Sequence, residues 1–577
     1  MSDQKTIPTP QERDARVLEL YEQLIEIEQR LIPTGLHVFG RPSSANQKAD
    51  LLRMVASFDR PEANARSLVD LVAESWSRGR SRPPATADED VRGPSGINEV
   101  VITAMELFVT ADQQEAEQFL LNDVGLSVEL SRPVFQFLHS ISEQLQTNTE
   151  LESLVRALRA EFIEPGPGAD IVQNPAILPT GRNTHSINPY GVPSSSSFAR
   201  SKLVADRLIE RFREEHQRYP ESLALVLWGL DNIKTQGDGV AQALWLLGVR
   251  PMRDALNRVT EVVPIPLDEL GRPRIDVVMT VSGIFRDLFS PTVQLLDKAV
   301  RLVASLDEPP EQNYVRKHVA EQMRLESCEL DDAATRVFSN APGNYGTNVN
   351  FMVMDSQWKD EETLGNLFVT RKCFAYGRDS HGNVIEGREA RRAMDRALAR
   401  VEATYQNIDT FEIGLTDVDH YFEYLGGISK AVEHRAQSRP AIYLSDSLSR
   451  DVKIRSLEET VRLESRAKTL NPKWYEGMLK HGFRGVAEIE NHVSNTFGWS
   501  ATADAVDDWI YTEVAKTFVL DETMLERLRD LNPHSAHSLV QRLLEANGRG
   551  YWDADESELE KLRDISRNLE DHLEGVA

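Results

Sequence analysis

Hydrophobic positions recur at two different spacings along the chain. From Asp14 to about Phe162 the apolar residues follow one another every three or four positions, which is the spacing of helices that bury one face. The first such run ends at Pro33, because proline cannot continue a helix. We therefore predict an all-helical region at 14–162, after a polar lead at 1–13 that we expect to be disordered.

A second pattern begins after the Pro- and Gly-rich stretch Glu164–Asp170, which marks a break in the chain. Short apolar runs followed by polar loops occur at Leu223–Gly229, Arg274–Gly283 and Ala334–Asn340. Runs of this kind, separated by helical stretches, indicate parallel strands in an α/β layer. We predict an α/β domain at 163–360, whose Rossmann-like parallel-sheet core spans about 170–360.

Helical spacing returns from Glu361 onward. The stretch Ser456–Leu470 is typical, since its apolar residues keep the helical period and it ends just before Pro472. We predict a mainly helical C-terminal region at 361–577. The fold class expected from the whole pattern is α/β with large all-helical portions, in which helical regions flank the Rossmann-like sheet.

Net charge and composition indicate which kinds of partner and which location to expect. The chain has 65 Lys and Arg against 91 Asp and Glu, so its formal net charge is -26, which repels nucleic acid and anionic membranes. No apolar stretch approaches the roughly 18 residues of a membrane span, so we expect no integral membrane segment. The two cysteines form no disulfide framework, and the first residues are polar, which predicts a cytoplasmic protein.

Several common catalytic motifs are missing from the sequence. It contains no G-x-x-x-x-G-K-[ST], no H-E-x-x-H and no G-x-S-x-G, and its 13 histidines show no zinc-like spacing. ATP hydrolysis by a P-loop, zinc hydrolysis and the nucleophile-elbow mechanism are therefore not expected of this chain.

Three polar loops follow the three predicted strands. They are Gly229–Gly239 with Asp231, Lys234 and Asp238; Ser282–Asp287; and Ser339–Asn348 with Asn340 and Tyr345. Because parallel strands end on the same side of a sheet, these loops are expected to converge on one binding rim. The alternative is that their Asn, Asp and Gly residues only make turns.

Two further stretches contain candidate catalytic or binding residues. The loop GRNTHSINPYGVP, from Gly181 to Pro193, holds Arg182 and His185, and a histidine can exchange protons near neutral pH. Farther on, Arg462 and Arg466 share a helix face, and Lys473 and Trp474 follow Pro472. Each of these residues also has a structural interpretation. His185 would be a capping or solvated histidine, the arginines would belong to a solvated ion-pair face, and Trp474 would pack in the core.

Five blocks of the sequence together resemble a known family. They are LPTGRNTHSINPYGVP, ALVLWGLDNIKTQGDGVAQALWLLGVRP, GRPRIDVVMTVSGIFRDLF, TRVFSNAPGNYGTN and NPKWYEGMLKHGFRGVAEIE. They resemble, in this order across roughly residues 15–575, the large or H subunit of magnesium chelatase and its sister family, the large subunit of aerobic cobaltochelatase. The histidine at position 185 and the stretches Ile25–Gly40 and Ser494–Val514 are more similar to the magnesium branch.

The resemblance implies a subunit of an enzyme that forms nitrogen–metal bonds. The family reaction is the ATP-dependent insertion of Mg²⁺ into protoporphyrin IX in chlorophyll and bacteriochlorophyll biosynthesis. ATP would be hydrolysed by the AAA+ partner, the I subunit, with the D subunit as the bridging partner. The alternatives are a non-catalytic truncated paralogue that binds a tetrapyrrole or docks the AAA+ partner, and a cobaltochelatase-type protein of cobalamin biosynthesis.

Family members are about twice as long as this chain. Their HGTHGSLE-type segment, which holds a glutamate implicated in catalysis, lies upstream of the matching region. The resemblance therefore implies a C-terminal part of the large subunit, a short paralogue, or one half of a split large subunit whose N-terminal half is a separate partner.

The resemblance also gives roles to the residues already named. The predicted catalytic residues, which would accept pyrrole protons or pass on hydrated Mg²⁺, are His185, Asp231 and Asp238. The predicted porphyrin-binding residues are Arg182, Lys234, Asn340, Tyr345, Arg462, Arg466, Lys473 and Trp474. Their cations would pair with propionates, and the aromatic side chains would line the ring. No residue is assigned as a metal ligand.

Overall fold

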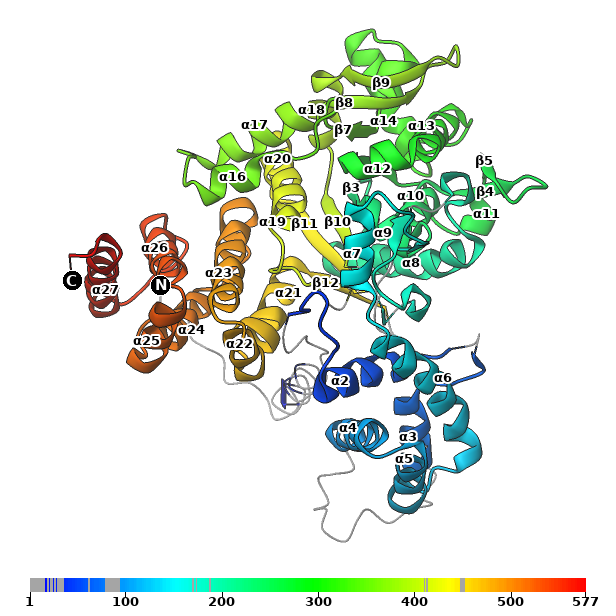
Figure 1. Cartoon of the computed structure of the whole chain (residues 1–577). Helices are drawn as coiled ribbons and strands as arrows, with labels where there is room; N and C mark the ends of the chain where they lie inside the picture. Colours follow the sequence, from blue (N-terminus) through cyan, green and yellow to red (C-terminus); the bar gives the residue numbers. More distant parts are fainter. Residues whose placement is uncertain are drawn as a thin grey trace. The chain divides into compact units, whose positions relative to one another are not determined.

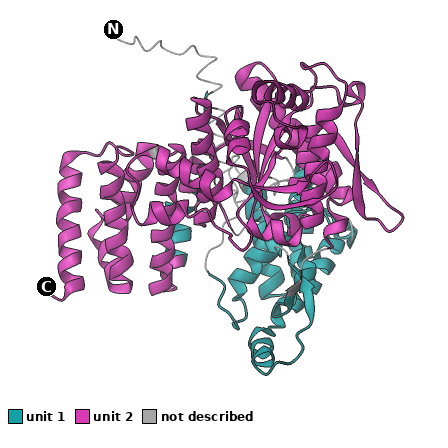
Figure 2. Ribbon diagram, turned by 90° about the horizontal axis from the view of Figure 1, so that it is seen from above, with its two compact units in different colours: residues 1–184, 466–477 teal, residues 185–465, 478–577 magenta. Residues whose placement is uncertain are grey.

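The structure is a computed structural model of the whole chain. It describes residues 36–60, 63–77, 94–168, 171–172, 174–185, 188–408, 410, 413–446 and 452–576, with a few isolated helical positions before residue 36. The predicted lead at 1–13 lies outside the described residues, as does most of the helical run that ends at Pro33. The chain forms two compact units, Met1–Thr184 with Arg466–Gly477 and His185–Ser465 with Met478–Ala577 (Figure 2).

The first unit is built mainly from helices. They are α2 (Ala45–Ala56), α3 (Leu68–Ser77), α4 (Pro94–Thr110), α5 (Gln113–Phe119), the π-helical η3 (Leu120–Val124), α6 (Val128–Gln146) and α7 (Glu150–Leu158). Helix α6 shows why they form, since Val134, Leu138 and Ile141 recur at helical spacing and are buried. Most of these helices share one hydrophobic core, as the apolar spacing predicts.

The second unit is organised around a mixed sheet (Figure 1). Its described strands lie in the order β12 (Lys453–Ser456), β11 (Ala441–Asp446), β10 (Ala403–Ile408), β3 (Ser222–Leu227), β6 (Asp276–Val281), β7 (Val337–Ser339), β8 (Phe374–Arg378) and β9 (Val384–Glu389). Neighbours from β11 to β7 are parallel, and β12, β8 and β9 are antiparallel to the strands beside them. The predicted α/β fold is confirmed, and β3, β6 and β7 coincide with the three apolar runs.

Strands β8 to β12 were not predicted, because the stretch from residue 361 was expected to be mainly helical. The central strand β10 shows the reason. Its sequence is ATYQNI, and it buries the polar side chains of Thr404, Gln406 and Asn407. Buried polar residues interrupt the apolar run by which a central strand is recognised. The predicted domain limits at 162/163 and 360/361 remain predictions.

Helices cover this sheet and connect its strands. They are α8 (Ser195–His216), α9 (Gly229–Lys234), α10 (Asp238–Leu247), α11 (Leu267–Leu270), α12 (Gly283–Leu288), α13 (Ser290–Ser305), α14 (Tyr314–Glu326), α15 (Leu330–Ala333), α16 (Val349–Met354), α17 (Glu361–Lys372), α18 (Arg391–Leu398), α19 (Asp419–Tyr421), η6 (Phe422–Gly426) and α20 (Gly427–Ala436). Helices α8, α10, α13 and α14 bury their apolar faces with the strands in one large core. A separate hairpin, β4 (Val249–Arg253) and β5 (Val259–Pro264), follows α10.

The chain ends in a run of helices, as predicted. They are α21 (Leu457–Glu464), η7 (Ser465–Thr469), α22 (Pro472–Leu479), α23 (Phe483–Ala503), α24 (Asp508–Phe518), α25 (Glu522–Leu531), α26 (Pro533–Gly548) and α27 (Glu556–Glu574). Helices α23, α26 and α27 lie side by side in this order (Figure 1). Within the described residues, none of the helices combines the length and the apolar character that a bilayer crossing requires.

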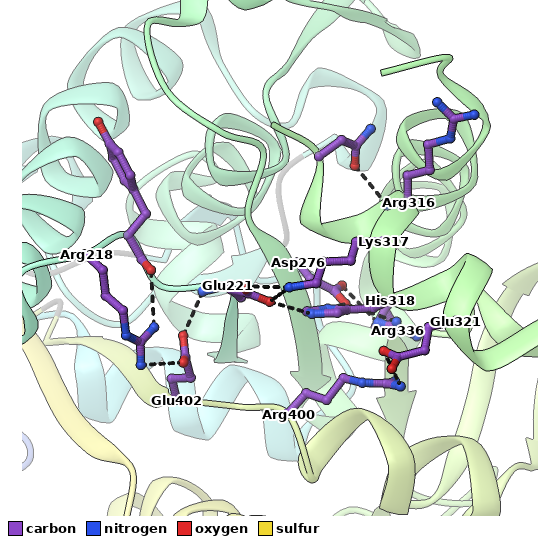
Figure 3. A network of polar contacts seen from close by, with 12 residues as sticks. Arg218, Glu221, Asp276, Arg316, Lys317, His318, Glu321, Arg336, Arg400 and Glu402 are labelled. Carbon is purple, nitrogen blue, oxygen red and sulfur yellow. Dashed lines mark hydrogen bonds and ion pairs between the residues drawn. The ribbon is translucent and has the colours of Figure 1, made fainter. Parts of the chain in front are cut away.

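The amino ends of the parallel strands carry a network of paired charges (Figure 3). Asp276, the first residue of β6, accepts hydrogen bonds from Arg336 Nε at 2.9 Å and Nη2 at 3.0 Å. His318 lies 2.9 Å from the same carboxylate through Nδ1 and 3.2 Å from Glu221 through Nε2, and Glu221 also binds Lys317. Burial would raise the pKa of Asp276, but Arg336 and His318 outweigh it and lower the pKa to about 2. This end of the sheet is built for stability.

Candidate functional site at the carboxyl ends of the strands

The segments that follow β3, β6 and β7 meet at the carboxyl ends of these strands. The first two were predicted as loops, but the structure has the short helices α9 and α12 there. Ser282 Oγ accepts hydrogen bonds from the backbone N–H of Gly229 and of Phe285, each at 3.1 Å. A side chain at position 229 would collide with Ile284, so glycine allows α9 to pack closely against α12. The predicted convergence of the first two loops therefore occurs through direct contacts.

Arg286 connects the second loop to the third. Its Nη1 donates to the carbonyl oxygens of Asn340 at 3.2 Å and Asn344 at 2.9 Å, and its Nε donates to Asp287 at 2.7 Å. The hydroxyl of Tyr345 donates to Asp287 at 2.7 Å, and its ring covers Gly283. All three predicted loops thus form one continuous rim.

The strand order reverses between β3 and β10, because β6 and β7 follow on one side of β3 while β10 and β11 lie on the other. Parallel sheets bind ligands outside the carboxyl ends at such a reversal. At this point Trp228 Nε1 donates to Gln406 Oε1 at 3.3 Å, and Asn407 Nδ2 donates to Asp231 at 3.3 Å. The rim therefore includes the place where this fold most often holds a small molecule.

A histidine–glutamate pair contributes to the rim from α19 and η6. His420 is exposed, and its Nδ1 lies 2.7 Å from Oε2 of Glu423, which is 0% exposed. The other oxygen of Glu423 accepts hydrogen bonds from Thr347 Oγ1 at 2.9 Å and from the N–H of Asn348 at 3.0 Å. A buried carboxylate thus orients an imidazole that reaches solvent.

These contacts change the acid–base properties of both partners. The hydrogen bond that His420 donates to Glu423 raises the pKa of His420, and the negative charge of Glu423 adds to the effect. Burial would raise the pKa of Glu423, but its hydrogen bonds to His420 and Thr347 outweigh it and lower the pKa below the ordinary value. The pair can therefore hold a proton on the imidazole near neutral pH and exchange it with a bound molecule.

A buried lysine lies behind this pair. Lys372, the last residue of α17, is 0% exposed, donates to the carbonyl oxygen of Val281 at 3.0 Å, and lies 4.0 Å from the ring centre of Tyr424. Burial lowers the pKa of Lys372 well below its ordinary value, and the nearby Glu423 only partly opposes this. Tyr424 in turn packs on Trp228 and donates to the carbonyl of Tyr345. Lys372 therefore ties the strand end to the rim.

Large apolar side chains are exposed on the short helices and loops that form the rim. They come from the short helices and loops that follow the strands: Leu230, Ile284, Leu288, Tyr345 and Phe351. Single exposed apolar residues are common on proteins, but a group of them around a polar centre marks a binding surface for an apolar molecule. We call these five residues the apolar rim.

All three predicted catalytic residues belong to the second unit, and the side chains of two of them are described. Asp231 is buried and contacts Asn407 at the strand reversal. Asp238 is also buried, and both of its oxygens are engaged, by Ser197 at 2.7 Å and by a two-pronged ion pair with Arg200. Burial raises the pKa of Asp238 against the effect of Arg200, yet these contacts favour a structural role. The side chain of His185 lies outside the described residues.

The predicted porphyrin-binding residues of this unit differ in accessibility. Tyr345 belongs to the apolar rim, and Lys234 is half-buried on α9. Asn340 is buried and closes its own loop by donating to the carbonyl of Gly346 at 2.8 Å. Arg462 forms a bidentate ion pair with Asp507. The guanidinium group that was predicted to bind a propionate is therefore already paired with a carboxylate of the chain. Their binding roles remain predictions.

The other predicted binding residues belong to the first unit. Arg182 donates to the carbonyl of Leu178 at 3.1 Å, and Arg466 and Lys473 are exposed. Trp474 is only 1% exposed, which favours the alternative interpretation that it anchors α22 in a core.

Sequence reasoning missed His420, Glu423 and Lys372. The first two had a recognisable pattern, since they stand three positions apart in DHYFEYLGG and such residues share a helix face. Lys372 had none, because a lysine at the end of a polar helix looks solvated. Among the described residues, no group of three or more His, Cys, Asp and Glu side chains is arranged to hold a metal ion.

A polar centre and an apolar rim at a strand reversal are the arrangement typical of α/β proteins that bind small molecules. Comparison with known proteins specifies the family. The family model described as CobN/Magnesium Chelatase matches residues 2–559, and the chain belongs to this family.

Similar proteins come from both branches. The chain is 44% identical to the chloroplastic magnesium-chelatase subunit ChlH of Oryza sativa subsp. indica, over 98% of this chain and 43% of the relative. It is 42% identical to the magnesium-chelatase H subunit of Cereibacter sphaeroides, over 80% of this chain and 38% of the relative. A solved structure, the catalytic subunit of cobaltochelatase from Mycobacterium tuberculosis, matches with a TM-score of 0.88 and 32% identity, over 98% of this chain and 47% of that one. The chain thus spans less than half the length of these relatives.

Proposed function

We propose that this chain is part of the large, porphyrin-binding subunit of a magnesium chelatase, which inserts Mg²⁺ into protoporphyrin IX at the expense of ATP. The observation that supports it most is the apolar rim, which surrounds a proton-exchanging pair at the strand reversal. The identity of 44% and 42% to magnesium-type subunits, against 32% to the aerobic cobaltochelatase subunit CobN of Sinorhizobium sp, supports the magnesium branch.

The chemistry of insertion fits these groups. Two pyrrole protons must leave the macrocycle, and Mg²⁺ must exchange some of its water for ring nitrogens. In our proposal the apolar rim packs against the flat face of the ring. His420, which Glu423 orients, accepts a pyrrole proton in those molecules in which its imidazole is neutral. Asp231 and His185 are proposed to assist in proton or metal transfer. Lys234, which lies in the same unit, is proposed to pair with a propionate. The propionate-binding roles of Arg182, Arg466 and Lys473, which belong to the first unit, are separate proposals.

ATP is proposed to be hydrolysed by a separate AAA+ protein, the I subunit, which the D subunit links to this chain. The absence of a P-loop from the sequence supports that division of labour. The part of the family protein that this chain lacks is proposed to be a further partner. We also propose a cytoplasmic location.

A binding titration followed by a reconstituted assay tests the function. Deuteroporphyrin should quench the intrinsic tryptophan fluorescence, and the chain with the I and D subunits and the missing part of the large subunit should insert Mg²⁺. If the reconstituted complex takes up only a corrin-type precursor, the cobaltochelatase alternative replaces our proposal. If porphyrin binds but insertion never occurs, the chain is a non-catalytic tetrapyrrole carrier.

The predicted loop residues are tested in the same assay. Our proposal expects Arg182→Ala to weaken porphyrin binding and His185→Ala to slow insertion. If both variants bind and insert as the wild type does, the loop at 181–193 is only structural.

A further inference from the structure

Helix α7 presents an apolar face that the described residues leave exposed. The residues of this face recur at positions i, i+3, i+4 and i+7, and Phe162 follows them: Leu151, Leu154, Val155, Leu158 and Phe162. Leu158 is 79% exposed and Phe162 is 73% exposed. We call these five side chains the α7 stripe.

The end of the stripe is held in place by the chain itself. Arg156 Nη2 donates to the carbonyl oxygen of Phe162 at 2.6 Å, and the N–H of Glu161 donates to the carbonyl of Arg156 at 3.0 Å. At the other end, the buried Glu150 accepts a hydrogen bond from His37 at 2.9 Å. The segment is therefore fixed at both ends while its apolar face is open.

Such a helix needs a partner for its stability. Helices shorter than about 12–15 residues are marginal in water, and most of their stability in proteins comes from packing an apolar face. Helix α7 has 9 residues. None of the described helices or strands packs extensively against it. Exposed apolar groups of this size mark protein–protein contact sites.

The length of the relatives indicates what covers the stripe. The match to the Oryza relative covers 98% of this chain but only 43% of that protein, and the match to the solved cobaltochelatase subunit covers 47% of that one. More than half of each family protein is thus polypeptide with no counterpart here. We propose that the α7 stripe is the docking site for that remaining part of the family protein. This inference rests on family membership and not on the proposed metal insertion.

Binding of the separately produced remaining part of the Oryza protein tests the proposal. Sedimentation velocity of the full chain with this polypeptide should show a complex. Leu154→Glu/Leu158→Glu should weaken it at least about tenfold, since central apolar contacts carry most of the binding energy. The matched control is Leu130→Glu/Leu203→Glu, which makes the same charge change on exposed leucines of α6 and α8 and should bind as the wild type does.

Hydrogen exchange gives a second readout that needs no variant. The amides of residues 152–160 should exchange fast in the chain alone and at least about tenfold more slowly in the complex. Strong protection in the chain alone would mean that its own residues cover the stripe. Concentration-dependent protection would mean that a second copy does. Either result overturns the proposal, as does failure of the Oryza polypeptide to bind or equal binding by the two double variants.

Discussion

The two ends of the parallel strands use charge in opposite ways. At the amino ends Asp276 is buried and paired with Arg336 and His318, and the network lies among side chains that pair with one another (Figure 3). At the carboxyl ends Glu423 is equally buried, but its partner His420 reaches solvent amid exposed apolar residues. In the amino-end network Asp276 and His318 are both buried and paired within the protein, whereas the pair at the carboxyl ends presents an exposed imidazole that can exchange protons with a ligand.

The largest expected effect is on stability at the amino ends. Asp276→Asn leaves Arg336 charged and buried without its counter-ion, so the free energy of unfolding should fall by about 3–5 kcal/mol in urea denaturation. Asp307→Asn is the matched control, because it removes an exposed partner of Arg316 and should cost less than about 1 kcal/mol. Equal losses in the two variants would contradict the contrast between buried and exposed pairs.

The next largest effect is expected on the rate of metal insertion and concerns the carboxyl ends of the strands. Glu423→Gln should slow Mg²⁺ insertion by the reconstituted complex by roughly 10²-fold, because His420 loses the carboxylate that orients it. Glu464→Gln is the control, since Glu464 is also buried and accepts hydrogen bonds from two backbone N–H groups, those of Leu415 and Thr416. The insertion rate is to be compared per folded molecule. If it falls equally in both variants, the proposed role of the His420–Glu423 pair is wrong.

The pH dependence of the free energy of unfolding gives a further test of the charge network at the amino ends of the strands. The pKa of Asp276 falls from 3.8 to about 2 on folding, so the unfolded chain takes up its proton first. The stability that Asp276 provides is therefore complete above about pH 5 and is lost as the pH falls towards 2, by about 2 kcal/mol. The stability gap between wild type and Asp276→Asn should narrow by that amount over this range. A gap independent of pH would show that Asp276 is not the titrating group.

The smallest effect concerns the apolar rim. Leu230→Ser/Ile284→Ser should weaken deuteroporphyrin binding about tenfold, since each substitution removes apolar surface available to the ring. Leu256→Ser, in the turn between β4 and β5, removes a similarly exposed side chain elsewhere and should leave the affinity unchanged. Fluorescence titration measures both, and an unchanged affinity of the rim variant would place the ring elsewhere.

The sequence predicts the two halves of the sheet unequally. Strand β3 reads SLALVL and is buried throughout, so an apolar run identifies it. Strand β10 buries Gln406 and Asn407, whose amides bond to neighbours that only the folded chain brings near. The loops after β3, β6 and β7 were therefore predictable, while the strand reversal beside β10 was not.

The same reason explains the site residues. Tyr345, in a loop, and Asp231, in the short helix α9, stand in segments that follow predicted strands, so their position at the rim could be expected. Glu423 and His420 stand in a helical stretch, and Lys372 ends a polar helix, where charged residues are normally solvated. Their burial or orientation depends on residues far away in the sequence, such as Thr347 and Val281.

The pairing of β3 with β10 has a consequence for folding. Leu223 lies beside Ala403, so the centre of the sheet joins segments that leave the ribosome far apart in time. Until β10 is made, β3 has an open edge of unpaired backbone groups and an apolar surface, which is a template for aggregation. Contacts between such distant segments also form slowly. We therefore expect the nascent chain to depend on chaperones until Ile408 has been synthesised, well before its last helices appear.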